Sequence, residues 1–272
     1  MSATDPDAVF GGSIPELYDH LLVPLIFEPY AADLAGRVAD LRPREVLEVA
    51  AGTGVATRAM ARALPADARL VATDLNQPML DRAAVVGTAR PVEWRQADAM
   101  GLPFDDASFD AVVCQFGVMF FPDVRRAFAE SRRVLRPGGH LVFSVWDCLE
   151  ENEFAATVTQ ALACLFPRDP PRFLARTPHG YHDPAVISSD LAKAGFDASP
   201  LLVTVSARSR AASPDMPAAA YCQGTPLRAE IAARAASGLA EATQACAGAI
   251  STRFGAGAVE GKIQAHVVMV RA

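Results

Sequence analysis

Three acidic residues stand at or near the ends of three predicted strands in the first half of the chain. Glu48 lies within the apolar run EVLEVA, Asp74 closes the apolar run RLVATD, and Asp98 closes the third strand, VEWRQAD. Between the first two, the tripeptide Gly-Thr-Gly at 52–54 precedes a helical pattern. Glycine permits positive φ and a close approach of a ligand to the backbone, and a helix N-terminus offers free N–H groups. These residues predict a binding site for a small polar ligand.

Two classes of ligand fit this pattern, a dinucleotide and an adenosine ligand without pyrophosphate. Asp74 lies 20 residues beyond Gly54, where a carboxylate can accept hydrogen bonds from both ribose hydroxyls. The dinucleotide fingerprint places its third small residue at 57, which is Thr57 here, and has no use for an acid at 48. A carboxylate at the end of the first strand suits a ligand that carries an ammonium group.

Alternating strands and helices are expected to position these residues. Strands are predicted at 45–51, 69–75, 92–98, 110–115, 140–146, 201–207 and 263–271, and helices at 55–64, 78–86 and 123–135. The strands are nearly continuous apolar runs, such as DAVVC, which is typical of a parallel sheet covered by helices on both faces. The first 40 residues are predicted to be helical, with Pro24 and Pro29 breaking them into short pieces.

The composition is that of a globular protein, with 51% hydrophobic and 21% charged residues. A net charge of −6 argues against nucleic-acid binding. The five cysteines are scattered and form no C-x-x-C, so neither a disulfide framework nor a metal site is expected. The first residues, MSATDPDAVFGG, carry acids where a signal peptide needs bases, and no apolar run approaches the roughly 20 residues that span a bilayer. We therefore expect a cytoplasmic protein without stable membrane insertion.

Four segments resemble, in order and spacing, those of the class I S-adenosylmethionine-dependent methyltransferases. They are EVLEVAAGTG, LVATDLNQPML, WRQADAMGLPFDDASFDAVVCQFGVMFF and RVLRPGGHLVFSVW. The chain is similar to the small-molecule group that includes the ubiquinone/menaquinone C-methyltransferases. One departure is Ala50, where many members have glycine. The resemblance implies an α/β fold: a Rossmann-like, doubly wound, seven-stranded and mostly parallel sheet with an antiparallel last strand, plus added helices over the carboxyl edge.

The resemblance also implies S-adenosyl-L-methionine as cofactor, with S-adenosyl-L-homocysteine as product. Glu48 should face the methionine ammonium, Asp74 the ribose hydroxyls, and Asp98 the adenine amino group. The full set of expected cofactor-binding residues is Tyr18, Glu48, Ala50, Gly52, Gly54, Asp74, Leu75, Asp98, Ala99, Gln115 and Phe116.

We expect one methyltransferase domain over residues 1–272. Within it, 1–43 should form a helical cap, 44–147 the cofactor-binding core, and 148–183 and 213–258 substrate-side insertions. The added segments are apolar and alanine-rich, which favours a small, partly apolar or aromatic acceptor, methylated at carbon, oxygen or nitrogen. His179 and His182 are the candidate catalytic bases; the alternative for His182 is that it only precedes the helix cap Asp183.

Two other functions remain open from the sequence. One is an NAD(P)-dependent oxidoreductase on a Rossmann fold, and the other is a non-catalytic module that binds S-adenosylmethionine. The oligomeric state is also left open, a homodimer included.

Overall fold

The computed structural model describes residues 7, 10, 12, 14–234 and 238–272. Most of the acidic N-terminal segment, and three residues of the expected 213–258 insertion, lie outside the described residues. The chain divides into two compact units. The sheet unit comprises Glu28–Trp146, Tyr181–Val205 and Ala265–Ala272, and the helical unit comprises Met1–Phe27, Asp147–Gly180 and Ser206–Gln264.

A seven-stranded sheet has the strand order β3-β2-β1-β4-β5-β7-β6. Its strands are β1 Glu45–Val49, β2 Arg69–Asp74, β3 Glu93–Gln96, β4 Phe109–Gln115, β5 Leu135–Trp146, β6 Leu201–Ala211 and β7 Val259–Arg271. Strands β1 to β5 pair in parallel, and β7 runs antiparallel to β5. The predicted α/β fold, with a mostly parallel sheet and an antiparallel last strand, is confirmed. Because β1 lies between β2 and β4, the carboxyl ends of these three strands meet at one edge.

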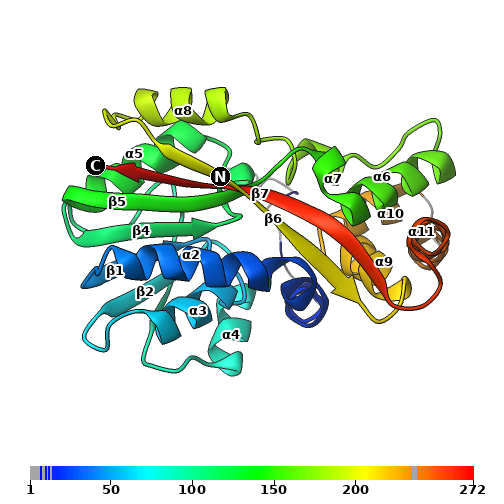
Figure 1. Ribbon diagram of the computed structural model, residues 1–272, viewed down its shortest axis with the longest axis horizontal. Coiled ribbons are helices and arrows are strands. Elements are labelled where there is room, and N and C mark those ends of the chain that lie inside the picture. The colour runs from blue at the N-terminus through cyan, green and yellow to red at the C-terminus, as the bar shows by residue number, and fades with distance from the viewer. Residues whose placement is uncertain (1–6, 8–9, 11, 13, 235–237) are drawn as a thin grey trace. The chain divides into compact units, whose positions relative to one another are not determined.

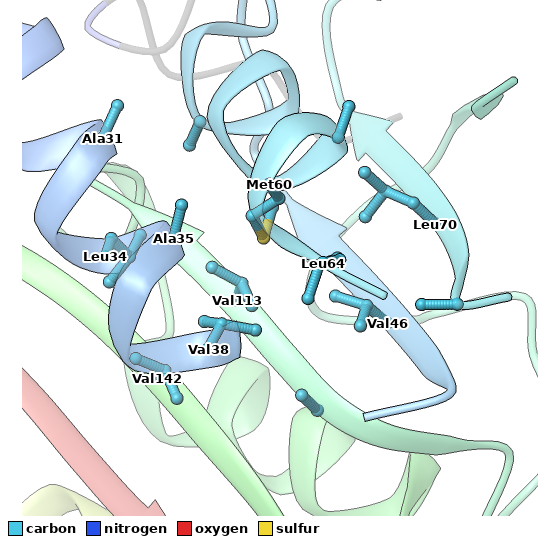
Figure 2. Close-up of a cluster of buried hydrophobic side chains, with 14 of the residues drawn as sticks. Ala31, Leu34, Ala35, Val38, Val46, Met60, Leu64, Leu70, Val113 and Val142 are labelled. Atoms are coloured by element: carbon cyan, nitrogen blue, oxygen red, sulfur yellow. The ribbon is translucent and has the colours of Figure 1, made fainter. Parts of the chain in front are cut away.

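Helices cover both faces of the sheet unit (Figure 1). They are α2 Glu28–Asp40, α3 Val55–Ala63, α4 Gln77–Val86, η3 Val118–Phe120, α5 Val124–Val134 and α8 Pro184–Lys193. Figure 2 shows one core cluster, in which the apolar sides of α2 and α3 meet β1, β4 and β5. Val142 of β5 belongs to this cluster, whereas the ring of its neighbour Phe143 meets Phe128 of α5 at a centroid distance of 5.2 Å. Successive strand side chains point to opposite faces, so β5 is buried on both.

The helical unit contains α1 Ile14–Leu17, η2 Tyr18–Phe27, η4 Leu149–Glu151, α6 Glu153–Leu165, α7 Phe173–Arg176, α9 Asp215–Gln223, α10 Leu227–Arg234 and α11 Gly238–Phe254. Buried Asn152 ties the start of α6 to β7. Its side-chain amide donates to the carbonyls of Asp147, Cys148 and Gln264, and its carbonyl oxygen accepts from the Gln264 amide. One side chain thus satisfies several backbone groups where α6 begins.

The expectation that Pro24 and Pro29 break the first helical segment is wrong. Residues 14–40 are helical throughout, with π-type hydrogen bonding over Tyr18–Phe27. A π-helix bonds each residue to one five positions away, so the hydrogen-bond pattern around Pro24 differs from that of an α-helix. Pro29 is the second residue of α2, directly after the point where π-type bonding gives way to α-helical bonding.

Candidate functional site

A glycine turn connects β1 to α3. Gly52 and Gly54 have φ values of 57° and 83°, in the left-handed region that favours glycine. A Cβ placed on Gly54 would lie 3.0 Å from the Trp94 ring and 3.2 Å from Ala83 Cβ. Gly54 is also the N-cap of α3 and offers no side chain to its amide groups. The turn therefore needs glycine, and it presents the N-terminus of α3 to a ligand.

The ends of β1 and β4 are strained where they meet. Ala50 and Phe116, which directly follow these strands, both have φ values of 54°. A Cβ on Gly117 would lie 2.5 Å from Ala50 Cβ and 2.7 Å from Cys114 Sγ, so the two strand ends are in close contact. Non-glycine residues in this conformation cost about 1–2 kcal/mol each, and such strain gathers at functional sites. Alanine at position 50, where many members of the family have glycine, therefore strains the backbone.

Asp74 joins the end of β2 to the glycine turn. Its carboxylate accepts from the Gly52 amide and the Asn76 amide, each at 2.8 Å. The side chain is buried, and burial is the main cause that raises its pKa. The next residue, Leu75, is apolar yet 43% exposed. A buried carboxylate beside an exposed apolar side chain offers a hydrogen-bond acceptor and a surface for a flat ring.

Glu48 lies one strand away and is 1% exposed. The Thr57 hydroxyl of α3 donates to its carboxyl group, and Glu48 forms no ion pair within the described part of the chain. Burial raises the pKa of Glu48 to about 8; the Thr57 hydrogen bond lowers it, nearby Asp74 raises it further, and Arg58 lowers it. A buried carboxyl group that forms no ion pair with the described residues is unusual in a protein core, and a positively charged ligand group would complement it.

Asp98 and Ala99 lie in the turn after β3, which ends at Gln96. Asp98 is exposed, and its carboxylate accepts from the Met100 amide at 2.9 Å. Ala99 is buried. The Ala97 amide donates to the Asp74 carbonyl at 3.0 Å, which brings this turn beside the end of β2.

Gln115 and Phe116 end β4. Gln115 is 9% exposed and pairs in register with Ser144 of β5. The Phe116 ring stacks on Trp146 at 3.9 Å and 6°, and Tyr30 of α2 meets both rings edge-on at 5.3 Å. All three aromatic side chains are buried, so they form a rigid apolar cluster behind the strand ends.

Tyr18 and the two candidate histidines occupy different environments. In the helical unit, the Tyr18 ring stacks on Phe27 at 5.0 Å. His179, in the same unit, is 6% exposed, and its Nδ1 lies 2.8 Å from the Asp147 carbonyl. His182 belongs to the sheet unit, where it is half-buried directly before the α8 N-cap Asp183.

Three site features were missed by the sequence reasoning. Arg58 Nη1 donates to the Thr53 carbonyl at 2.6 Å and so braces the glycine turn. Trp94 limits the space beside Gly54. In the sequence, Thr57 served only as evidence against a dinucleotide-binding fingerprint, whereas in the structure its hydroxyl donates to Glu48. A polar residue on the first turn of α3 was the only available signal, because these contacts join elements far apart in the sequence.

The residues of this strand edge fit S-adenosylmethionine. Glu48 and Asp74 are buried carboxyl groups that form no ion pair with any described residue, and the glycine turn lies between them. A ligand with one ammonium group, two neighbouring hydroxyls and a flat base would match Glu48, Asp74 and Leu75 in turn.

Comparison with known proteins assigns the chain to a class. A model described as a methyltransferase domain matches residues 47–143. The phosphoethanolamine N-methyltransferase 2 structure from Haemonchus contortus superimposes with a TM-score of 0.59 at 14% identity, over 94% of this chain and 56% of that one. Together with the strand order, this likeness defines the Rossmann-like fold of class I methyltransferases.

Sequence relatives narrow the assignment. The demethylmenaquinone methyltransferase of Clavibacter sepedonicus is 42% identical over 107 residues, 39% of this chain and 42% of that protein. The chain spans half or less of the length of this and two similar relatives. The ubiquinone/menaquinone biosynthesis C-methyltransferase UbiE of Burkholderia mallei (strain SAVP1) is 35% identical over 173 residues, 59% of this chain and 70% of that protein. The chain belongs to the class I S-adenosylmethionine-dependent methyltransferase family, in the group of the ubiquinone/menaquinone C-methyltransferases.

Proposed function

We propose that this protein transfers a methyl group from S-adenosyl-L-methionine to a small, partly apolar or aromatic metabolite and releases S-adenosyl-L-homocysteine. The observation that carries the proposal is the pair of buried carboxyl groups, Glu48 and Asp74, at adjacent strand ends around a glycine turn. Their spacing along β1 and β2 and the lack of an ion pair in the described chain match an amino-acid–nucleoside ligand better than a dinucleotide.

The proposed contacts follow the three strand ends. Glu48 pairs with the methionine ammonium, and Asp74 accepts from the ribose hydroxyls. Leu75 covers one face of the adenine, while Asp98 accepts from the adenine amino group through the oxygen not engaged in its turn. The remaining contacts are backbone approaches at Ala50, Gly52, Gly54 and Ala99, and side-chain contacts from Gln115, Phe116 and Tyr18.

When bound, the cofactor would supply a methyl group on a sulfonium, which is an excellent leaving group. The protein's part is then alignment and exclusion of water, because methyl transfer is an in-line displacement. The stacked rings of Phe116 and Trp146, held edge-on by Tyr30, keep the ends of β4 and β5 rigid and apolar. A dry environment favours a reaction in which charge on sulfur is lost.

His179 is the stronger of the two candidate bases in its local geometry. Its Nδ1 donates to the Asp147 carbonyl, which fixes the orientation and the tautomer of a neutral ring. That tautomer can accept a proton from an acceptor hydroxyl, amine or ring carbon. His182 remains the second candidate because it is half-buried beside a helix start.

The names of the relatives favour an electron-rich ring carbon of a quinol-type metabolite as acceptor. A net charge of −6 supports a small molecule rather than a nucleic acid. Among the described residues, no helix combines the length and apolarity of a membrane span. We propose that the enzyme acts in the cytoplasm on an acceptor of this kind.

Calorimetric titration tests the proposal. Wild-type protein should bind S-adenosylhomocysteine and should show no heat with NAD(P)H. Asp74→Ala should weaken binding by about 2–3 kcal/mol, since two hydrogen bonds to a charged group are lost. Asp74→Asn, which keeps the size and one acceptor oxygen, should lose less. Binding of NAD(P)H but not S-adenosylhomocysteine would refute the proposal, and an unchanged affinity in Asp74→Ala would remove that residue from the site.

A further inference from the structure

The environment of Glu48 differs from that of an ordinary buried acid. Its side chain is 1% exposed, and the described structure gives its carboxyl one side-chain hydrogen-bond donor, the neutral Thr57 hydroxyl. Its backbone carbonyl is engaged separately, by the Thr73 hydroxyl at 2.9 Å. The Thr57 backbone amide is a second neutral donor, but no charged group in the described structure donates a hydrogen bond to this carboxyl group to offset the loss of water.

Four groups face this carboxyl from the elements packed around it. Helix α3 contributes the Thr57 hydroxyl and the Arg58 guanidinium, β2 contributes the Asp74 carboxylate, and β4 contributes the Cys114 thiol. Arg58 directs Nη1 to the Thr53 carbonyl and forms no ion pair with Glu48 within the described structure. The Arg58 charge still favours the ionised form of Glu48, whereas the Asp74 carboxylate repels a negative charge there, and burial is the largest of these influences.

We propose that Glu48 holds a proton in the ligand-free protein and that binding of the cofactor's ammonium group expels this proton to solvent. The inference rests on the proposed function, because it needs an ammonium-bearing ligand at this strand end. The exchange balances as a neutral carboxylic acid plus an ammonium giving a carboxylate–ammonium pair plus one proton in the buffer. No other bond is made or broken.

The burial of Glu48 supports the exchange. Burial raises its pKa to about 8, so about nine tenths of the unliganded molecules carry the proton at pH 7. An ammonium group at hydrogen-bond distance reverses the balance, since an opposite charge in a low-dielectric site strongly favours ionisation. If the ligand pairs with the ionised form, its apparent affinity should rise about tenfold per pH unit below the pKa of Glu48 and level off above it.

Proton release can be measured without turnover. Binding of S-adenosylhomocysteine is followed by calorimetry at pH 6.5 in three buffers of different ionisation enthalpy, so that the slope gives the number of protons released. We expect nearly one proton for wild-type protein. The matched probe is 5′-methylthioadenosine, which has the nucleoside but neither the amino nor the carboxyl group, and its binding should release none. This comparison uses the wild-type protein and does not depend on any variant folding.

Glu48→Gln identifies the source of the proton. The variant cannot titrate and keeps an oxygen that can accept from Thr57, so S-adenosylhomocysteine should bind more weakly and without proton release. Release that persists in Glu48→Gln, or equal release with both wild-type ligands, would overturn the assignment. Binding of S-adenosylhomocysteine without release would overturn the inference while the proposed function stands. Failure of wild-type protein to bind the ligand at all would instead refute the proposed function.

Discussion

The burial of Glu48 predicts an unusual pH dependence of stability in the unliganded protein. Its pKa is about 8 when folded, against an ordinary value of 4.5. Between these values the folded chain keeps a proton that the unfolded chain has released, so the free energy of unfolding should fall as pH rises. The contribution is about 1.4 kcal/mol per pH unit, or about 5 kcal/mol across the whole window.

Substitution by glutamine isolates this contribution. Glu48→Gln keeps the size of the side chain but carries no proton, so its unfolding free energy should lack the decline due to Glu48. The difference between wild type and variant should grow by about 2–3 kcal/mol from pH 5.5 to 7.5, in favour of the variant. All other titrating groups are common to both proteins, so their contributions cancel in the difference in unfolding free energy between wild type and variant.

Urea unfolding at several pH values is the appropriate assay. The informative quantity is how the difference in unfolding free energy between wild type and Glu48→Gln changes with pH. Its absolute value is less informative, because an amide does not reproduce every contact of a carboxylic acid. Thr57→Val removes the hydroxyl that stabilises the ionised form, so its decline in stability should extend to higher pH. A flat difference between wild type and Glu48→Gln over pH 5.5–7.5 would show that Glu48 is ionised when folded and that burial does not raise its pKa as described.

Three further substitutions test the geometry by urea unfolding. Ala50→Gly should raise the free energy of unfolding by about 1 kcal/mol, because glycine adopts a φ of 54° without strain. Ala51→Gly is the control: Ala51 has no positive φ, so this change should lower the free energy of unfolding. Similar losses in both variants would show that Ala50 is not strained. Gly54→Ala should lower the free energy of unfolding more than Gly87→Ala. Both glycines have φ near 80°, but of these two positions only at Gly54 would an added Cβ lie close to neighbouring atoms. Equal losses would show that close packing at Gly54 does not affect stability. Asn152→Ala should lose about 2–4 kcal/mol because buried backbone groups lose their partners, and a loss below about 1 kcal/mol would refute that role.

Much of the sheet follows from local pattern. Apolar runs buried on both faces predicted β1, β2 and β4 to within about two residues at each end, and the glycines at 52 and 54 predicted a tight turn before α3. Strands β6 and β7 are longer than predicted, because their outer parts alternate polar and apolar residues and pair with each other outside the main apolar runs. Such alternation is a weaker signal than a continuous apolar run.

The chemistry of the site depends on contacts that no local pattern contains. The sequence by itself determined that carboxyl groups follow successive strands, because strand ends and acidic residues can be read directly from the chain. Only the tertiary structure decided that Glu48 is buried with no ion-pair partner among the described residues, and that Phe116 stacks on Trp146. It also decided that Ala50 adopts a conformation which its side chain disfavours. Burial, charge balance and backbone strain arise when distant elements pack together, so they set the pKa and rigidity of groups whose presence the sequence already shows.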